Sequence, residues 1–245
     1  MLATIVVLGV LTGGWFLLHT SLFAARVVTV QGEVHTSAQE IEAVAGVTTH
    51  PPLVDVDPGA VASRLERLPW IATAAVDRQW PDGLRITVVE RTPVAVIRQS
   101  EPALDAPRSR GAAGGPVPSL RGWAEVDRTG RVLADVSSPP AGLVPVVAPV
   151  SPGVPGTNVG SAAAPGLAVA ASLPKAFSAQ VTGVVVGHGG VVTLTMSTPI
   201  SVDLGNVVQL PAKYEDVAAI LAGAKLVAGD VIDVSVPRAP VVDQG

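Results

Sequence analysis

The sequence predicts an α+β protein built from an N-terminal transmembrane helix (residues 1–25), a small β-α-α-β-β domain (26–93) and a β-rich domain with helices (94–245). The first 25 residues contain no Asp, Glu, Lys or Arg. Val and Thr are abundant and alternate with other residues over short segments, as is typical of strands. The stretch 98–120 is rich in Pro, Gly, Ala and Arg without a hydrophobic period, which predicts a flexible insertion within the second domain.

The apolar N-terminus predicts a membrane anchor. A helix that rises about 1.5 Å per residue crosses the roughly 30 Å hydrocarbon core with about 20 residues. A cleaved signal peptide is the alternative interpretation. However, the run is longer than the usual apolar core of about 7 to 15 residues, and a cut after Ala24 or Ala25 would place bulky Leu22 or Phe23 three residues before it. We therefore expect an uncleaved anchor.

The orientation of this anchor is ambiguous in the sequence. No basic residue precedes the apolar run and Arg26 follows it, so a literal reading of the positive-inside rule places the C-terminal bulk in the cytoplasm. We expect instead that translation starts upstream and adds a basic cytoplasmic segment, which would appear as a longer product on N-terminal sequencing. The C-terminal domains would then lie outside the cytoplasm.

The small domain begins with a strand at Arg26–Gln31. Ser37 and Glu40 form a capping-box pattern, which predicts the start of a short helix that Gly46 ends. Asp57 is the expected N-cap of a second helix over Pro58–Leu68.

Two further strands are expected at Ile71–Arg78 and Leu84–Glu90, joined by the turn Trp80–Gly83. Pro93 cannot donate to a sheet and should end pairing at the domain boundary. Trp70 and Trp80 are expected to pack in the core or against the turn. Four charged side chains are expected to lie on solvated surfaces: Arg78, Arg85, Glu90 and Arg91.

In the second domain, Val94–Ile97 and the hairpin Trp123–Leu133 are expected to be neighbouring strands, with the hairpin turn at Arg128–Gly130. Pro139–Gly160 reads as irregular. Ala162–Leu173 is an Ala-rich helix that contains Pro and Gly.

The C-terminal third predicts a hairpin from Val181–Val186 and Val191–Met196, followed by alternating Ile, Val and Leu at 200–204. An amphipathic helix should start at Pro211. The last strand is expected at Val231–Val236.

The run Leu68–Ile97 carries Leu-Pro-Trp, Arg-Gln-Trp-Pro and Glu-Arg-Thr-Pro in that order, behind LFAARVVTVQG at 22–32. This arrangement resembles the FtsQ/DivIB cell-division family, of the actinobacterial type. The resemblance implies a POTRA domain at 26–93 and an FtsQ-type β domain at 94–245. It also implies a single-pass scaffold in the cytoplasmic membrane, enriched at the division septum. Such a scaffold links early and late division proteins and helps to control septal peptidoglycan synthesis through protein–protein binding.

The resemblance further implies FtsB and FtsL-like proteins and other divisome components as partners. In that family the C-terminal strand region docks a segment of FtsB by strand addition, in which an edge strand supplies main-chain bonds. Val231–Val242 matches this layout but lacks an aromatic residue that some members have there. The partner-binding residues are then Ser235, Val236, Arg238 and Pro240. The alternative is an ordinary core strand or a self-protected edge.

Composition argues against several other functions. The net charge of −4 disfavours nucleic-acid binding, and the absence of cysteine excludes disulfides and thiolate metal sites. The four histidines lack companions at ligand spacing, and no nucleophile elbow, P-loop or dinucleotide fingerprint is present. We therefore expect no enzyme activity, cofactor, metal or small-molecule substrate. A POTRA-containing export or envelope-assembly chaperone and a membrane-anchored cell-wall enzyme remain as alternative functions.

Overall fold

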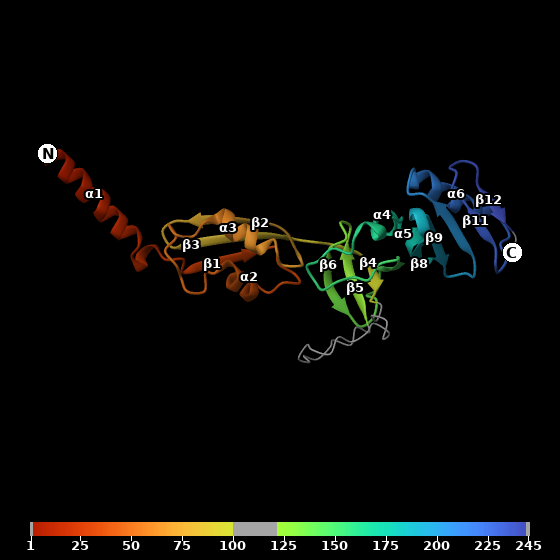
Figure 1. Cartoon of the computed structure of the whole chain (residues 1–245), viewed down its shortest axis with the longest axis horizontal. Coiled ribbons are helices and arrows are strands. Elements are labelled where there is room, and N and C mark those ends of the chain that lie inside the picture. The colour runs from red at the N-terminus through yellow and green to blue at the C-terminus, as the bar shows by residue number, and fades with distance from the viewer. Residues whose placement is uncertain (1, 100–121, 244–245) are drawn as a thin grey trace, which may run out of the picture. The chain divides into compact units, whose positions relative to one another are not determined.

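A computed structural model describes residues 2–99 and 122–243 of the chain (Figure 1). The chain divides into two compact units, Met1–Arg91 and Thr92–Gly245. Apart from Arg98 and Gln99, the expected insertion at 98–120 lies outside the described residues.

The first unit opens with helix α1 (Leu2–Leu18), which has no charged residue and no buried side chain. Within residues 2–99 and 122–243, no helix combines the length and apolar composition that crossing a membrane requires. A short 3-10 helix, η1 (Ser21–Phe23), follows. Ala24 and Ala25 are buried, and the Ala25 N–H donates to Pro51 O at 2.9 Å. The folded domain therefore starts two residues before the expected boundary.

Three strands and two helices form the small domain (Figure 1). In the sheet order β1-β3-β2, β1 (Val27–Gln31) is parallel to β3 (Gly83–Glu90), and β3 is antiparallel to β2 (Ile71–Gln79). Helices α2 (Ala38–Ala45) and α3 (Pro58–Leu65) bury their apolar residues with those of the sheet. This core contains Ile41, Ala45, Val61, Leu65, Ile71, Val76, Leu84, Ile86 and Val88.

The ends of both helices follow from local sequence. Ser37 Oγ accepts the Glu40 N–H at 3.2 Å, and Gly46 takes φ 75° at the end of α2, where a Cβ would be strained. Asp57 accepts the N–H groups of the first turn of α3. The expected extension of α3 to Leu68 is wrong, because the chain tightens into i to i+3 bonds after Leu65, such as Leu68 N–H to Leu65 O at 2.9 Å.

Two arginines that the sequence places on the surface instead bind backbone carbonyls. Arg78 donates from Nε and Nη2 to Val56 O at 3.0 and 2.6 Å, and so ties β2 to the loop before α3. Arg91 Nε donates to Ile71 O at 3.2 Å. Both side chains are half-buried, whereas Arg85 is exposed as expected.

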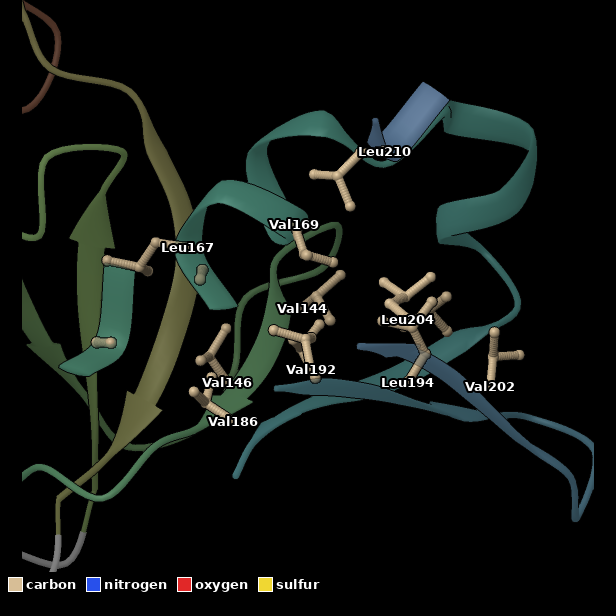
Figure 2. Packing of buried hydrophobic residues seen from close by; sticks show 14 of the residues in the cluster. Val144, Val146, Leu167, Val169, Val186, Val192, Leu194, Val202, Leu204 and Leu210 are labelled. Atoms are coloured by element: carbon tan, nitrogen blue, oxygen red, sulfur yellow. The ribbon is translucent and has the colours of Figure 1, made fainter. Parts of the chain in front are cut away.

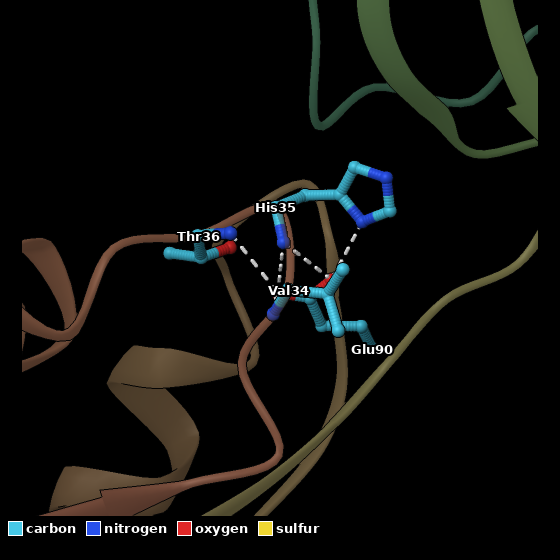
Figure 3. A network of polar contacts seen from close by, with 4 residues as sticks. All are labelled: Val34, His35, Thr36 and Glu90. Carbon is cyan, nitrogen blue, oxygen red and sulfur yellow. Dashed lines mark hydrogen bonds and ion pairs between the residues drawn. The ribbon is translucent and has the colours of Figure 1, made fainter.

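The expectation that Glu90 lies on a solvated surface is also wrong, because its side chain is only 7% exposed. Its carboxylate accepts the backbone N–H groups of Val34, His35 and Thr36 at 2.9 to 3.0 Å, and it lies 2.8 Å from His35 Nδ1 (Figure 3). The His35 ring stacks on Trp70 at 3.9 Å. Burial favours a higher pKa for Glu90, but the hydrogen bonds from Val34, Thr36 and His35 outweigh it and lower the pKa from 4.5 to about 2.

The second unit is a mixed sheet of nine strands among its described residues, in the order β12-β11-β10-β9-β8-β7-β4-β5-β6. The helices are α4 (Ala164–Ser172), α5 (Lys175–Ser178), α6 (Leu210–Gly223) and the 3-10 turns η2 (Ser161–Ala163) and η3 (His188–Gly190). The strands are β4 (Pro93–Arg98), β5 (Trp123–Asp127), β6 (Val132–Val136), β7 (Val144–Val147), β8 (Val181–Val186), β9 (Val192–Met196), β10 (Ser201–Gly205), β11 (Val231–Asp233) and β12 (Val241–Asp243).

One continuous apolar core lies between this sheet and its helices (Figure 2). Alternate residues of β9 and β10 belong to it, in keeping with the register that places Leu194 opposite both Val184 and Val202. Leu167 and Val169 contribute from α4, and Leu210 contributes from the start of α6.

The hairpins β5–β6 and β8–β9 and the pairing of β4 with β5 confirm the sequence expectations. Three expectations are wrong. The irregular stretch Pro139–Gly160 contains β7, which is parallel to both β4 and β8. Pro93 begins β4 rather than ending a strand, a position where a missing N–H is tolerated. The last strand is not Val231–Val236, because β11 ends at Asp233 and β12 follows.

Candidate binding site at the C-terminal sheet edge

Strand β12 forms one edge of the large sheet. It pairs antiparallel with β11, where Val231 lies opposite Asp243 and Asp233 lies opposite Val241, and β11 is parallel to β10 on its other side. In the described chain, β12 has a neighbour on one side only. The expected edge, β11, is therefore an interior strand, and the unpaired N–H and C=O groups belong to β12.

The segment between β11 and β12 is held in one conformation by hydrogen bonds. The Val234 N–H donates to Asp203 O at 2.9 Å, and the Ser235 N–H donates to Asp233 Oδ1 at 2.8 Å. A tight turn follows, closed by the Ala239 N–H to Val236 O at 3.2 Å. The chain thus returns to the sheet with a fixed geometry before β12 begins.

Arg238 occupies a strained position in this turn. Its φ of 63° lies in the left-handed region, which an L-residue with a long side chain seldom adopts. The Arg238 N–H donates to Asp216 Oδ2 of α6 at 2.8 Å. Arg238 also lines a groove of about 450 Å³ together with Pro237, Gln209, Pro211 and Ala212. The turn and the start of α6 therefore form one surface.

A buried lysine of α6 bonds to the chain at the end of β10, next to this surface. Lys213 of α6 is 0% exposed, and its Nζ donates to Leu204 O at 2.7 Å, Asn206 O at 2.7 Å and Asn206 Oδ1 at 3.1 Å. Burial lowers the pKa of Lys213, and the negative charges of Asp203 and Asp233 partly oppose this shift. The ammonium group joins α6 to the end of β10.

Asp233 extends this network to the turn. Hydrogen bonds from the Ser235 hydroxyl and the Ser235 N–H lower the pKa of Asp233, burial opposes them, and the charge of Lys213 lowers it further. Lys213, Asp203 and Asp233 are therefore named together as the Lys213 network. It connects α6, β10 and β11 with the segment that leads to β12.

Comparison with known proteins identifies the family to which the chain belongs. The family model for the FtsQ-type POTRA domain matches residues 23–91. The cell division protein FtsQ of Streptomyces collinus is 32% identical over 256 residues, which cover 98% of this chain and 85% of that protein. The chain belongs to the FtsQ family of cell-division proteins. FtsQ of Mycobacterium tuberculosis is 31% identical over 99% of this chain and 68% of its own length.

As expected for an FtsQ-family chain, the first unit is a POTRA domain, and its matched region begins at Phe23, next to the buried Ala24 and Ala25. FtsQ of Mycolicibacterium smegmatis is 40% identical over 83 residues, a third (34%) of this chain and 25% of that protein. No group of three or more His, Asp or Glu side chains that could hold a metal occurs among residues 2–99 and 122–243.

In this FtsQ-family protein, the residues singled out by the sequence lie in the turn before the edge strand. Val236 is 61% exposed, Arg238 and Pro240 are exposed, and Ser235 is half-buried against Gly205. Sequence reasoning missed Val241, which is 59% exposed on the edge strand itself, and Lys213. A Val-Val-Asp segment after two prolines was the available indication of β12, but three residues are too few to show a period.

Proposed function

We propose that this FtsQ-family protein is a single-pass membrane scaffold of the division machinery that binds FtsB-like and FtsL-like partners through strand addition. The single observation that supports this proposal most directly is the one-sided pairing of β12 at the edge of the nine-stranded sheet. A partner segment added there would gain main-chain hydrogen bonds from the edge and selectivity from alternate side chains. The exposed Val236 and Val241 provide apolar contacts for such a segment.

The geometry of the turn supports a preformed site. Ser235, Val236, Arg238 and Pro240 are the proposed partner-binding residues, and β12 is the strand that pairs with the partner. Because the turn is already fixed by hydrogen bonds to Asp233 and Asp216, little conformational entropy is lost when a partner binds.

The proposed anchor is the N-terminal apolar stretch. The seventeen residues of α1 carry no charge, and none of their side chains is buried against the rest of the protein. An apolar helix with a wholly exposed surface is stabilised when it enters a bilayer. The proposed location is the cytoplasmic membrane, with both folded units outside the cytoplasm, and membership of the FtsQ family of cell-division proteins supports enrichment at the septum.

Co-purification tests the docking site. Full-length tagged protein is recovered from solubilised membranes, and bound proteins are identified by mass spectrometry. Val236→Asp and Val241→Asp are expected to lose the FtsB-like partner because a carboxylate on the contact surface is costly to desolvate. Val154→Asp, at an exposed valine in the loop that bonds to β6, is the matched control and should retain the partner. Unchanged recovery with both edge variants would refute docking at this edge.

Depletion in cells separates the alternative functions. A scaffold of the division machinery predicts filaments without septa. Mislocalised envelope proteins with normal septa would favour the export or assembly chaperone, and loss of a wall-processing activity would favour the cell-wall enzyme.

A further inference from the structure

A small apolar surface of the POTRA unit lies where the chain enters it from α1. Leu22 is 63% exposed and Trp80 is 51% exposed. The rings of Phe23 and Trp80 meet edge to face with their centroids 6.0 Å apart. Pro81, next to Trp80, is also exposed. These four residues, from two segments distant in the sequence, are named the basal surface.

The basal surface is a fixed part of the fold. The Phe23 carbonyl accepts the Leu53 N–H at 2.7 Å. The Arg26 and Val27 N–H groups both donate to Asp82 O, at 2.9 and 3.1 Å. The segment that leaves α1 and the turn that carries Trp80 are thus bonded to each other, and half of a large indole ring stays in solvent without a partner in the described chain to cover it.

The basal surface also lies close to the end of α1. Only four residues separate Leu18, the last residue of α1, from Phe23, so the five steps between them span at most about 17 Å. The 3-10 turn η1 shortens this distance. His19, directly after α1, lies with Nε2 3.3 Å from Asp55 Oδ1 of the POTRA unit. The polar layer of a bilayer extends roughly 5 to 8 Å beyond the hydrocarbon core on each side.

We propose that the basal surface inserts into the headgroup region of the same bilayer that holds α1, with Trp80 as its main contact. This inference rests on the proposed membrane anchoring of α1. An indole ring is favoured at this depth because its apolar body and its N–H group match a layer that is apolar on one side and wet on the other.

Charge does not select the lipid. Arg26 and Asp82, which are joined by a backbone hydrogen bond beside the basal surface, carry opposite charges. A contact made by Trp, Leu, Phe and Pro therefore depends on the headgroup layer itself rather than on anionic lipid. Its consequence is that the POTRA unit is held against the membrane at two points, α1 and Trp80, rather than by a single flexible tether.

Single-tryptophan variants of the full chain test this inference. Each is reconstituted into phosphatidylcholine vesicles that contain lipids with a quencher at a known depth, and the loss of emission is measured. Trp15 alone should be quenched by deep probes, and Trp80 alone by shallow probes with a blue shift. Val89→Trp in a background without other tryptophans is the control. Val89 is 58% exposed, and it lies six residues along β3 from Gly83, about 20 Å away.

The outcomes separate this inference from the proposed anchoring. Quenching of Trp15 without quenching of Trp80 would overturn the membrane contact and leave the anchor intact. Quenching of neither would overturn both. Equal quenching of Trp80 and of the Val89→Trp control would show nonspecific adsorption and also refute the inference. Replacing half of the lipid by phosphatidylglycerol should leave the Trp80 result unchanged, and a contact seen only with the anionic lipid would contradict it.

Discussion

Glu90 of the POTRA unit and Lys213 of the β unit are both buried charges that backbone groups satisfy, and they differ in the elements that they hold together. Glu90 of the POTRA unit accepts N–H groups from three consecutive residues, Val34 to Thr36 (Figure 3). Lys213 of the β unit donates to carbonyls at the end of β10 from a different element, α6. Glu90 fixes one loop on one strand end, whereas Lys213 joins a helix to a sheet.

This difference predicts different consequences when each charge is removed. The loop around Glu90 has further contacts, since His35 stacks on Trp70 and Ser37 caps α2. The end of β10 and the turn before β12 depend on the Lys213 network, because Asp233 binds Ser235 and lies near Lys213. Removal of Lys213 should therefore destabilise the turn that carries the proposed partner site. Removal of Glu90 should destabilise only the loop that its carboxylate binds.

The largest effect is expected for Lys213→Ala. It leaves the carbonyls of Leu204 and Asn206 without their donor and opens a cavity, so the free energy of unfolding should fall by about 4 kcal/mol. Urea denaturation measures the loss, and hydrogen exchange should locate it in β10, β11 and the start of α6. Lys225→Met, at an exposed lysine, should change stability by less than about 0.5 kcal/mol. A Lys213→Ala loss as small as this control would contradict the role of the network.

A smaller effect is expected for Glu90→Gln, which keeps the shape and removes the charge. The lowering of the Glu90 pKa from 4.5 to about 2 corresponds to about 3 kcal/mol, so a loss of about 2 to 3 kcal/mol is expected near pH 7. Thermal unfolding monitored in the POTRA unit measures it. Glu40→Gln retains the capping box and is the control on the same unit. An equal response of the two variants would show that the charge of Glu90 does not matter.

The same substitution has a defined pH dependence. Because the pKa of Glu90 is lower in the folded than in the unfolded protein, its contribution is complete above about pH 4.5. It is lost progressively as the pH falls from there towards about 2. The stability difference between wild type and Glu90→Gln should therefore shrink over this window. A difference that stays constant down to pH 2 would show that Glu90 is not the titrating group.

The two charges also mark the limit of what the sequence reveals. Ser37, Glu40 and Gly46 act through neighbours in the chain, and the helix that they delimit is predicted and confirmed. Glu90 reads as one more polar residue at a strand end, because its partners lie 54 to 56 residues away. In the sequence, Lys213 is a charged residue within an amphipathic helix, which is typical of a solvent-exposed position. In the structure it is completely buried, and its Nζ donates to three acceptor atoms that lie before that helix in the chain.

The sequence does not predict the short strands β7 and β12, for a related reason. Strand β7 has four residues with Pro145 among them, and β12 has three, so neither shows an alternating pattern. Their pairing is decided by the strands beside them. The assignment of Ser235, Val236, Arg238 and Pro240 to a partner site stays a prediction. The assignment of the sheet edge to Val231–Val236 is wrong, because β12 forms that edge.

The smallest expected effect is a gain in stability from a change at Gln209. It tests whether the backbone at the start of α6, close to Lys213, is strained. Gln209 precedes α6 with φ 55°, and its side chain makes no capping hydrogen bond, so it bears the left-handed backbone without compensation. Gln209→Gly should stabilise the β unit by about 0.5 to 1 kcal/mol, because glycine adopts this φ without a Cβ clash and its greater unfolded-state entropy offsets part of the gain. Gln209→Ala keeps the Cβ and should be neutral. Denaturant midpoints compare the two variants. If Gln209→Gly is less stable than Gln209→Ala, the backbone at residue 209 is not strained, and the Lys213 network holds the start of α6 without imposing strain there.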